Sequence, residues 1–208
     1  GHMNASKTPL VSRGRVQPLL MGVINVTPDS FSDGGRYDRV ETALNRAQTL
    51  VGEGADILDI GAESTRPGAK PVPTDEEWRR LSPFVEALVK LQLPVKLSID
   101  SRKGDILRRC ADLGFDFVNN VEGLVDTSTL QRLSRYPKLN YIAMHMHGTP
   151  ETMQINPLSA QKALESVEAF FEHSHKELLA AGFTKERIWL DPGIGFGKTD
   201  SANIKLLG

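Results

Sequence analysis

The chain has 208 residues, of which 39% are hydrophobic and 25% charged, and its formal net charge at pH 7 is -1. It has no long Lys/Arg block, which excludes the electrostatic footprint of a nucleic-acid binder. No apolar run reaches the roughly 20 residues of a membrane span. Because Cys110 is the one cysteine, an intrachain disulfide is excluded and a reducing, cytoplasmic compartment is expected.

The N-terminal part of the chain carries little structural signal. Residues 1–3 read Gly-His-Met and resemble a cloning remnant, and residues 4–18 form an N-terminal segment without a predicted element. We expect one domain over residues 19–208, since a chain of this length is too short for two large domains.

From residue 19 onward, short apolar runs alternate with amphipathic segments. The runs are rich in Ile, Val and Leu and alternate only weakly, which is typical of strands buried on both faces of a parallel sheet. The predicted strands are 19–26, 55–61, 94–100, 116–121, 140–146 and 188–193.

The segments between these runs have helical periodicity. A first helix is expected from Asp38, a candidate N-cap, to Gly52. A second is expected from Thr74, which would form a capping box with Glu77. Further helices are expected over residues 106–113, 130–136, 163–178 and 199–208.

This alternation predicts repeated βαβ units and an α/β fold. Periodicity alone leaves two arrangements open, an open doubly wound sheet and a (β/α)8 barrel, which normally takes about 250 residues. The polar residues at the strand ends favour the barrel, because all carboxyl strand ends of a barrel meet at one mouth. In an open sheet only those at a switch point meet. These residues are Asn25, Glu63 to Arg66, Asp100, Asn119, Asn120, His145, His147 and Asp191.

Two motifs suggest other chemistry on first reading. The glycine-rich run 193–199 resembles a phosphate-binding loop, but Pro192 stands where the first glycine is needed and Lys198 replaces the third glycine of a dinucleotide motif. His145 and His147 share a face of a strand and could form a metal pair. No third ligand follows at a recognisable spacing, so zinc is not favoured.

Four motifs resemble dihydropteroate synthases, in the order of that family and from about residue 20 to the end of the chain. They are Asn25-Val-Thr-Pro-Asp-Ser-Phe-Ser-Asp-Gly-Gly35, Asp59-Ile-Gly-Ala-Glu-Ser-Thr-Arg-Pro-Gly68, Ser98-Ile-Asp-Ser101 and Asp191-Pro-Gly-Ile-Gly-Phe-Gly-Lys198. The resemblance implies a TIM (β/α)8 barrel, of which about six βα units would be present here.

The resemblance also implies an activity in folate biosynthesis. Such an enzyme is a transferase that joins 7,8-dihydropterin-6-ylmethyl diphosphate to p-aminobenzoate and gives 7,8-dihydropteroate and diphosphate. Sulfonamides compete with p-aminobenzoate. The implied mechanism is SN1-like and needs no protein nucleophile, the implied cofactor is Mg²⁺, and the full-length family is expected to form homodimers.

Residue by residue, the resemblance implies that Asp100, Asn119 and Asp191 hold the pterin and that Met144 lines its apolar face. Ionised carboxylates suit the N–H donors of a pterin edge, with charge-assisted hydrogen bonds of roughly 1.5–3 kcal/mol each. Asn25 is the implied Mg²⁺ ligand, and Asn25, Asp100 and Asp191 are the implied catalytic positions.

The remaining implied contacts come from loops. Two mobile loops, within 27–35 and 63–68, are implied to close over the diphosphate and to form the p-aminobenzoate pocket. The substrate-binding positions expected in loops are Phe31, Thr65, Arg66, Pro67, Gly195 and Phe196.

The chain stops early in the sixth helix, so we expect a fragment that is poorly stable and inactive by itself.

Two other interpretations of the same residues stay open. One alternative is the methyltetrahydrofolate domain of a corrinoid methyltransferase, which shares the strand-end Asp and Asn residues. Another is an inactive paralogue that binds pterin or stabilises a partner.

Overall fold

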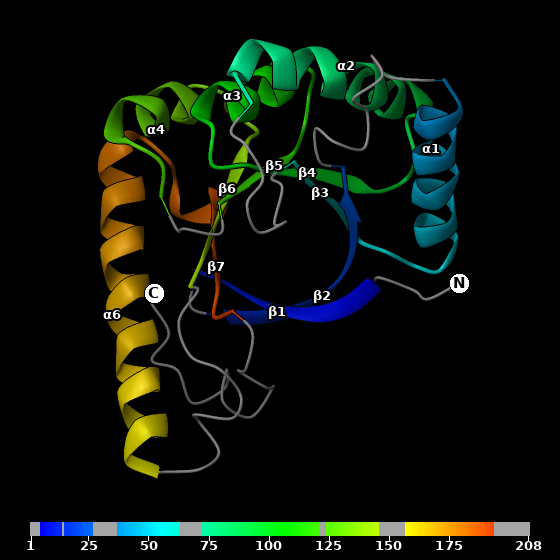
Figure 1. Cartoon of the computed structure of the whole chain (residues 1–208). Helices are drawn as coiled ribbons and strands as arrows, with labels where there is room; N and C mark the ends of the chain where they lie inside the picture. Colours follow the sequence, from blue (N-terminus) through cyan, green and yellow to red (C-terminus); the bar gives the residue numbers. More distant parts are fainter. Residues whose placement is uncertain are drawn as a thin grey trace. The chain divides into compact units, whose positions relative to one another are not determined.

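A computed structural model describes residues 5–13, 15–26, 37–62, 72–120, 124–145 and 157–193. They fall into two compact units: unit 1 comprises Gly1–Lys7 and Leu19–Val118, and unit 2 comprises Thr8–Pro18 and Asn119–Gly208. From residue 15 onward, strands and helices alternate along the chain, as the sequence predicts (Figure 1).

Unit 1 is built on parallel strands. The strands are β2 (Arg15–Asn25), of which this unit holds the part from Leu19, β3 (Ile57–Gly61), β4 (Lys96–Asp100) and the start of β5 (Phe117–Asn120). β3 pairs in parallel with β2 on one side and with β4 on the other. Four of its five residues are buried, which confirms the expectation of strands covered on both faces.

Two aspartates fix the amino ends of these strands. Asp56 exchanges two hydrogen bonds with Leu20 of β2: its N–H donates to the Leu20 carbonyl at 2.7 Å, and its Oδ2 accepts from the Leu20 N–H at 2.8 Å. Asp116 does the same with Leu97 of β4, at 2.9 Å for both bonds. These carboxylates therefore continue the ladder beyond the strands and help to set their register.

The helices of unit 1 are α1 (Tyr37–Gly52), α2 (Thr74–Leu91) and α3 (Gly104–Asp112). α1 packs on β3 and α3 on β4, whereas α2 contacts α1 and α3. Full burial of each Leu, Ile or Phe side chain contributes about 1.5–3 kcal/mol. Gly54 and Gly114 follow α1 and α3 with φ of 98° and 99°, a left-handed conformation that favours glycine. Fully buried members of this core are Ile57, Leu58, Ile60, Phe84, Val85, Ile99, Ile106 and Leu107.

The predicted caps of α1 and α2 are wrong. Helix α1 begins at Tyr37, so Asp38 lies inside it. The N-cap of α2 is Pro73, which makes no side-chain cap bond, so Thr74 and Glu77 form no capping box. Glu77 is buried instead and its carboxylate lies 3.4 Å from the Lys103 ammonium, which explains why it does not turn back to the helix start.

Unit 2 contains a strand that the sequence analysis missed. Its strands are β1 (Ala5–Ser12, mostly in this unit), β6 (Asn140–Met144) and β7 (Ile188–Asp191). β6 and β7 are parallel, whereas β1 pairs antiparallel with β7 through Val11 and Leu190. β1 has only two consecutive large apolar residues, Leu10 and Val11, too few to give a periodic signal, although both are buried.

The helices of unit 2 are α4 (Thr127–Ser134) and α6 (Pro157–Ala181), followed by the 3-10 turn η2 (Lys185–Arg187). Asp126 caps α4, since its carboxylate accepts hydrogen bonds from the N–H and the hydroxyl of Thr129 at 3.1 and 2.7 Å. Tyr136, predicted inside this helix, follows its end. None of the helices in the described ranges has the length and apolar character that crossing a membrane requires.

Arg187 ties the carboxyl ends of both helices of unit 2 together. Its Nη1 donates to the carbonyls of Tyr136 and Leu139 at 2.8 and 3.1 Å, just beyond α4. Its Nη2 donates to Ser134 at 3.1 Å and to Gly182, just beyond α6, at 3.2 Å. The planar guanidinium thus satisfies four carbonyls at once, which a lysine ammonium does not match.

We predict that Arg187→Met lowers the free energy of unfolding by about 2–4 kcal/mol, because charge-assisted hydrogen bonds are lost and carbonyls lose their donor. Arg187→Lys should recover only part of this. Urea denaturation measures the effect, with Arg135→Met as the control, because Arg135 is exposed and should change stability by less than about 0.5 kcal/mol. Equal losses in Arg187→Met and Arg135→Met would contradict the role given to Arg187.

Candidate active site

The predicted site residues that the structure describes all lie at carboxyl ends of strands. Asn25, Asp100, Met144 and Asp191 are the last residues of β2, β4, β6 and β7, and Asn119 is the penultimate residue of β5. The strand-end placement that the sequence predicts is therefore confirmed for Asn25, Asp100, Asn119 and Asp191, whereas Met144 was predicted only to lie on its strand. The predicted residues outside the described ranges are Phe31, Thr65, Arg66, Pro67, Gly195 and Phe196.

In unit 1, register aligns Asn25, Gly61 and Asp100 in one row across three strands. Gly61 gives the Asn25 side chain its room: a Cβ at Gly61 would lie 2.7 Å from Asn25 Oδ1. The ladder continues beyond the row, since Val26 N–H donates to the Gly61 carbonyl at 2.8 Å and Ala62 N–H to the Asp100 carbonyl at 3.0 Å. An amide oxygen and a carboxylate therefore flank a glycine on a rigid backbone.

Two residues further back along the strands, Asp59 and Ser98 are register partners and both are buried. The Ser98 hydroxyl donates to Asp59 Oδ1 at 2.7 Å, which stabilises the carboxylate inside the unit. Sequence analysis gave this pair no role. The signal was present, because Asp59 and Ser98 stand two residues before Gly61 and Asp100 and so lie on the same strand face.

In unit 2, Asp191 is a nearly buried carboxylate, with 8% of its surface exposed. Register places it opposite Met144, and its Oδ1 accepts a hydrogen bond from the Gly193 N–H at 2.9 Å. Burial raises the pKa of Asp191 to about 6, against the opposing effect of the Gly193 N–H. A ligand that donates N–H groups to the Asp191 carboxylate would favour its ionised form and offset the cost of burying that charge.

Asn119 is a second buried polar group of unit 2, with 3% of its surface exposed. Its Oδ1 has no hydrogen-bond partner within the part of the chain that the structure describes. A buried acceptor left without a donor costs about 1–3 kcal/mol, so this oxygen is suited to a ligand N–H.

The side chain of His145 contacts α6. Its Nε2 lies 3.2 Å from the Ser166 hydroxyl, and its ring meets Phe170 edge-on with 5.3 Å between centroids. His147 lies outside the described residues. Across the described ranges, which do not include His147, no group of three or more His, Cys, Asp or Glu residues could hold a metal ion.

Cys110 is not placed for nucleophilic chemistry. It lies in α3 among the buried residues of that helix, and burial raises the pKa of its thiol. The thiolate is therefore disfavoured, in agreement with a site that needs no protein nucleophile.

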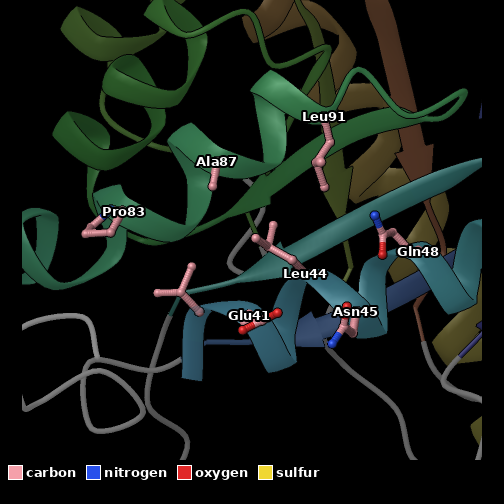
Figure 2. A pocket seen from close by; sticks show the side chains of 8 residues that line it. Glu41, Leu44, Asn45, Gln48, Pro83, Ala87 and Leu91 are labelled. Carbon is pink, nitrogen blue, oxygen red and sulfur yellow. The ribbon is translucent and has the colours of Figure 1, made fainter. Parts of the chain in front are cut away.

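A groove on the helices contains none of the predicted site residues. It has a volume of about 440 Å³ and lies between α1 and α2 (Figure 2). Leu44 of α1 and Ala87 and Leu91 of α2 contribute apolar surface to it. Its position among helix side chains separates it from the strand-end residues that the sequence predicts as the site.

Comparison with known proteins identifies the family. A family model described as pterin binding enzyme matches residues 21–208. The dihydropteroate synthase of Neisseria meningitidis serogroup C is 43% identical over 196 residues, which are 93% of this chain and 68% of the relative.

Solved structures agree with this match. The dihydropteroate synthase of Xanthomonas albilineans with 4-aminobenzoic acid has a TM-score of 0.67 and 34% identity, covering 94% of this chain and 71% of its own. The enzyme of Anaplasma phagocytophilum with bound 6-hydroxymethylpterin-monophosphate has a TM-score of 0.68 and 34% identity, covering 85% of this chain and 67% of its own.

These neighbours are TIM barrels, so the α/β (β/α)8 barrel predicted from the sequence is confirmed as the fold class. With the pterin-binding model, the curated relatives and the solved structures in agreement, the chain belongs to the dihydropteroate synthases, the pterin-binding transferases of folate biosynthesis.

Proposed function

We propose that this protein condenses 7,8-dihydropterin-6-ylmethyl diphosphate with p-aminobenzoate and releases 7,8-dihydropteroate and diphosphate. The observation that carries the proposal is 43% identity to a dihydropteroate synthase over 93% of the chain. The amide and carboxylate groups at the strand ends supply suitable chemistry. Among solved relatives, one holds 4-aminobenzoic acid and another a pterin monophosphate.

The pterin is bound by Asp100, Asn119 and Asp191, and Met144 lines its apolar face. Asn119 offers a buried oxygen without a donor in the described structure, and Asp191 offers a buried carboxylate. A pterin edge presents several N–H groups, and such donors would compensate both.

In the reaction, the bond between the pterin methylene carbon and the diphosphate oxygen breaks, and its electron pair leaves with diphosphate. The arylamine lone pair then forms the C–N bond, and the nitrogen loses a proton. Asp100 and Asp191 stabilise the positive charge that develops on the pterin, because fixed carboxylates act strongly where water is excluded.

Asn25 is proposed as the protein ligand of Mg²⁺. The amide oxygen of Asn25 is a hard donor of the type that Mg²⁺ prefers. Asn25 is exposed, and Gly61 leaves space beside its side chain. A Mg²⁺ site commonly uses one or two protein ligands together with substrate phosphate and water. When bound, the ion would neutralise charge on the leaving diphosphate.

Several further assignments rest on the family resemblance. Phe31, Thr65, Arg66 and Pro67 are proposed for the p-aminobenzoate side and Gly195 and Phe196 for substrate binding. A homodimer, sulfonamide sensitivity and a cytoplasmic location are proposed on the same ground.

Turnover tests the proposal directly. With both substrates and Mg²⁺, the full-length protein should form dihydropteroate and diphosphate in equal amounts, and a sulfonamide should raise the apparent KM for p-aminobenzoate. Pterin binding without product would instead identify an inactive paralogue.

The raised pKa of Asp191 predicts a pH-dependent pterin affinity. Because the pterin N–H donors favour the ionised carboxylate, Kd should be constant above pH 7. Below the folded pKa of about 6 it should rise by about tenfold per pH unit. Isothermal calorimetry between pH 5 and 7.5 measures this.

Asp191→Asn should bind weakly and lose this dependence. Asp105→Asn is the matched control, because Asp105 is exposed on α3 and should leave the profile unchanged. A parent profile that stays flat from pH 5 to 7.5 would contradict the assignment of Asp191.

Gly61→Ala tests the place of Asn25. The added methyl displaces Asn25 Oδ1, so the Mg²⁺ concentration for half-maximal turnover should rise by about tenfold, equivalent to about 1.4 kcal/mol. Gly52→Ala is the control, since nothing lies within 4 Å of its added Cβ.

In the Asn25→Ala background, Gly61→Ala should add no further effect, because both changes act on one group. Full additivity of the two substitutions would show that Gly61 acts independently of Asn25.

A further inference from the structure

His145 is a buried histidine that directly follows β6, with 3% of its surface exposed. Consecutive side chains of a strand point to opposite faces, so His145 and Met144 face opposite ways. Met144 is the register partner of Asp191, which places these two on one face. The His145 ring faces α6, where Ser166 and Phe170 contact it.

The backbone of His145 contacts the segment that carries Asp191. Its N–H donates to the Asp191 carbonyl at 2.9 Å. Its carbonyl oxygen faces Gly193 so closely that a Cβ at Gly193 would overlap it. Gly193 has φ of 87°, and its N–H donates to Asp191 Oδ1 at 2.9 Å. The contacts therefore run from α6 through His145 and Gly193 to the Asp191 carboxylate.

We propose that His145 is a positioning residue for pterin binding: its ring, held by Ser166 and Phe170, fixes the carbonyl against which Gly193 packs. This directs the Gly193 N–H at the Asp191 carboxylate. The proposal rests on the role proposed above for Asp191.

The contacts explain why a histidine suits this position. The ring combines a polar contact to Ser166 with an edge-on contact to Phe170, and together these fix its direction more narrowly than an aliphatic side chain would. A loosened ring would let the backbone at residue 145 shift, and the Gly193 N–H would then point less well at Asp191. A histidine that merely fills the space between β6 and α6 would affect stability but not the carboxylate.

The pH profile of pterin binding separates these two roles. Burial and the Gly193 N–H are the causes that set the pKa of Asp191, with opposite signs. A weaker N–H bond should therefore move the midpoint of the profile to higher pH. The titration of His145 itself is measured in the Asp191→Asn background, where the carboxyl is absent.

The variants are His145→Leu, which loses the ring and Nε2, and Ser166→Ala, which removes the hydroxyl from α6. Each should raise the midpoint by about half a pH unit. The ratio of the variant's Kd to that of the parent should then be about threefold larger at pH 5.5 than at pH 7.5. His145→Gln should have a midpoint between those of His145→Leu and the parent, because the glutamine amide can reach the Ser166 hydroxyl.

Ser174→Ala is the matched control. It makes the same chemical change on the same helix, and Ser174 is buried without a hydrogen-bond partner among the described residues. Its midpoint should equal that of the parent. If His145→Leu does not fold, Ser166→Ala still decides the question.

Unchanged midpoints in His145→Leu and Ser166→Ala, whatever their stability, would overturn the positioning role. That result is distinct from a failure of the proposed pterin site, in which Asp191→Asn would bind pterin as tightly as the parent at every pH.

Discussion

The register of the parallel strands is the constraint on which the site depends. In unit 1 it places Asn25, Gly61 and Asp100 in one row, with Asp59 and Ser98 two residues back on the same strand face. A slip of one residue would turn every side chain to the other face, so that Ile24 and Ile99 would replace Asn25 and Asp100. The paired hydrogen bonds of Asp56 with Leu20 and of Asp116 with Leu97 oppose such a slip, away from the carboxyl ends that carry the site residues.

Strand register also sets the positions of the site residues in unit 2, where it buries polar groups. Pairing of β6 with β7 brings Asp191 opposite Met144 and buries its carboxylate, which raises its pKa to about 6. Asn119 is buried with an oxygen that has no partner in the described ranges. Polar groups that are costly in the free protein gain most from a ligand that brings matching donors, so this part of the fold gives up stability at the position proposed for the pterin.

The strands, the helices and the polar residues at the strand ends could be predicted from the sequence, because short stretches of the chain carry the information. Apolar runs and helical stripes located six strands and five helices, whereas the helix predicted over residues 199–208 lies outside the described residues. Polar residues at the ends of the runs indicated Asn25, Asp100, Asn119 and Asp191. The family motifs added roles that periodicity cannot supply.

What the sequence could not provide depends on neighbours distant along the chain. β1 has too few apolar residues to be seen until β7 pairs with it. Glu77 reads as half of a capping box, but burial beside Lys103 decides its conformation. The room that Gly61 leaves for Asn25 and the contact of His145 with Ser166 are properties of packing, with no spacing that reveals them.

A crystal structure of the full-length protein with a bound pterin tests the central claim most directly. The account predicts pterin N–H groups within hydrogen-bond distance, about 2.7–3.2 Å, of Asn119 Oδ1 and of the Asp191 carboxylate. A pterin bound without contact to either residue, for example in the groove between α1 and α2, would contradict it.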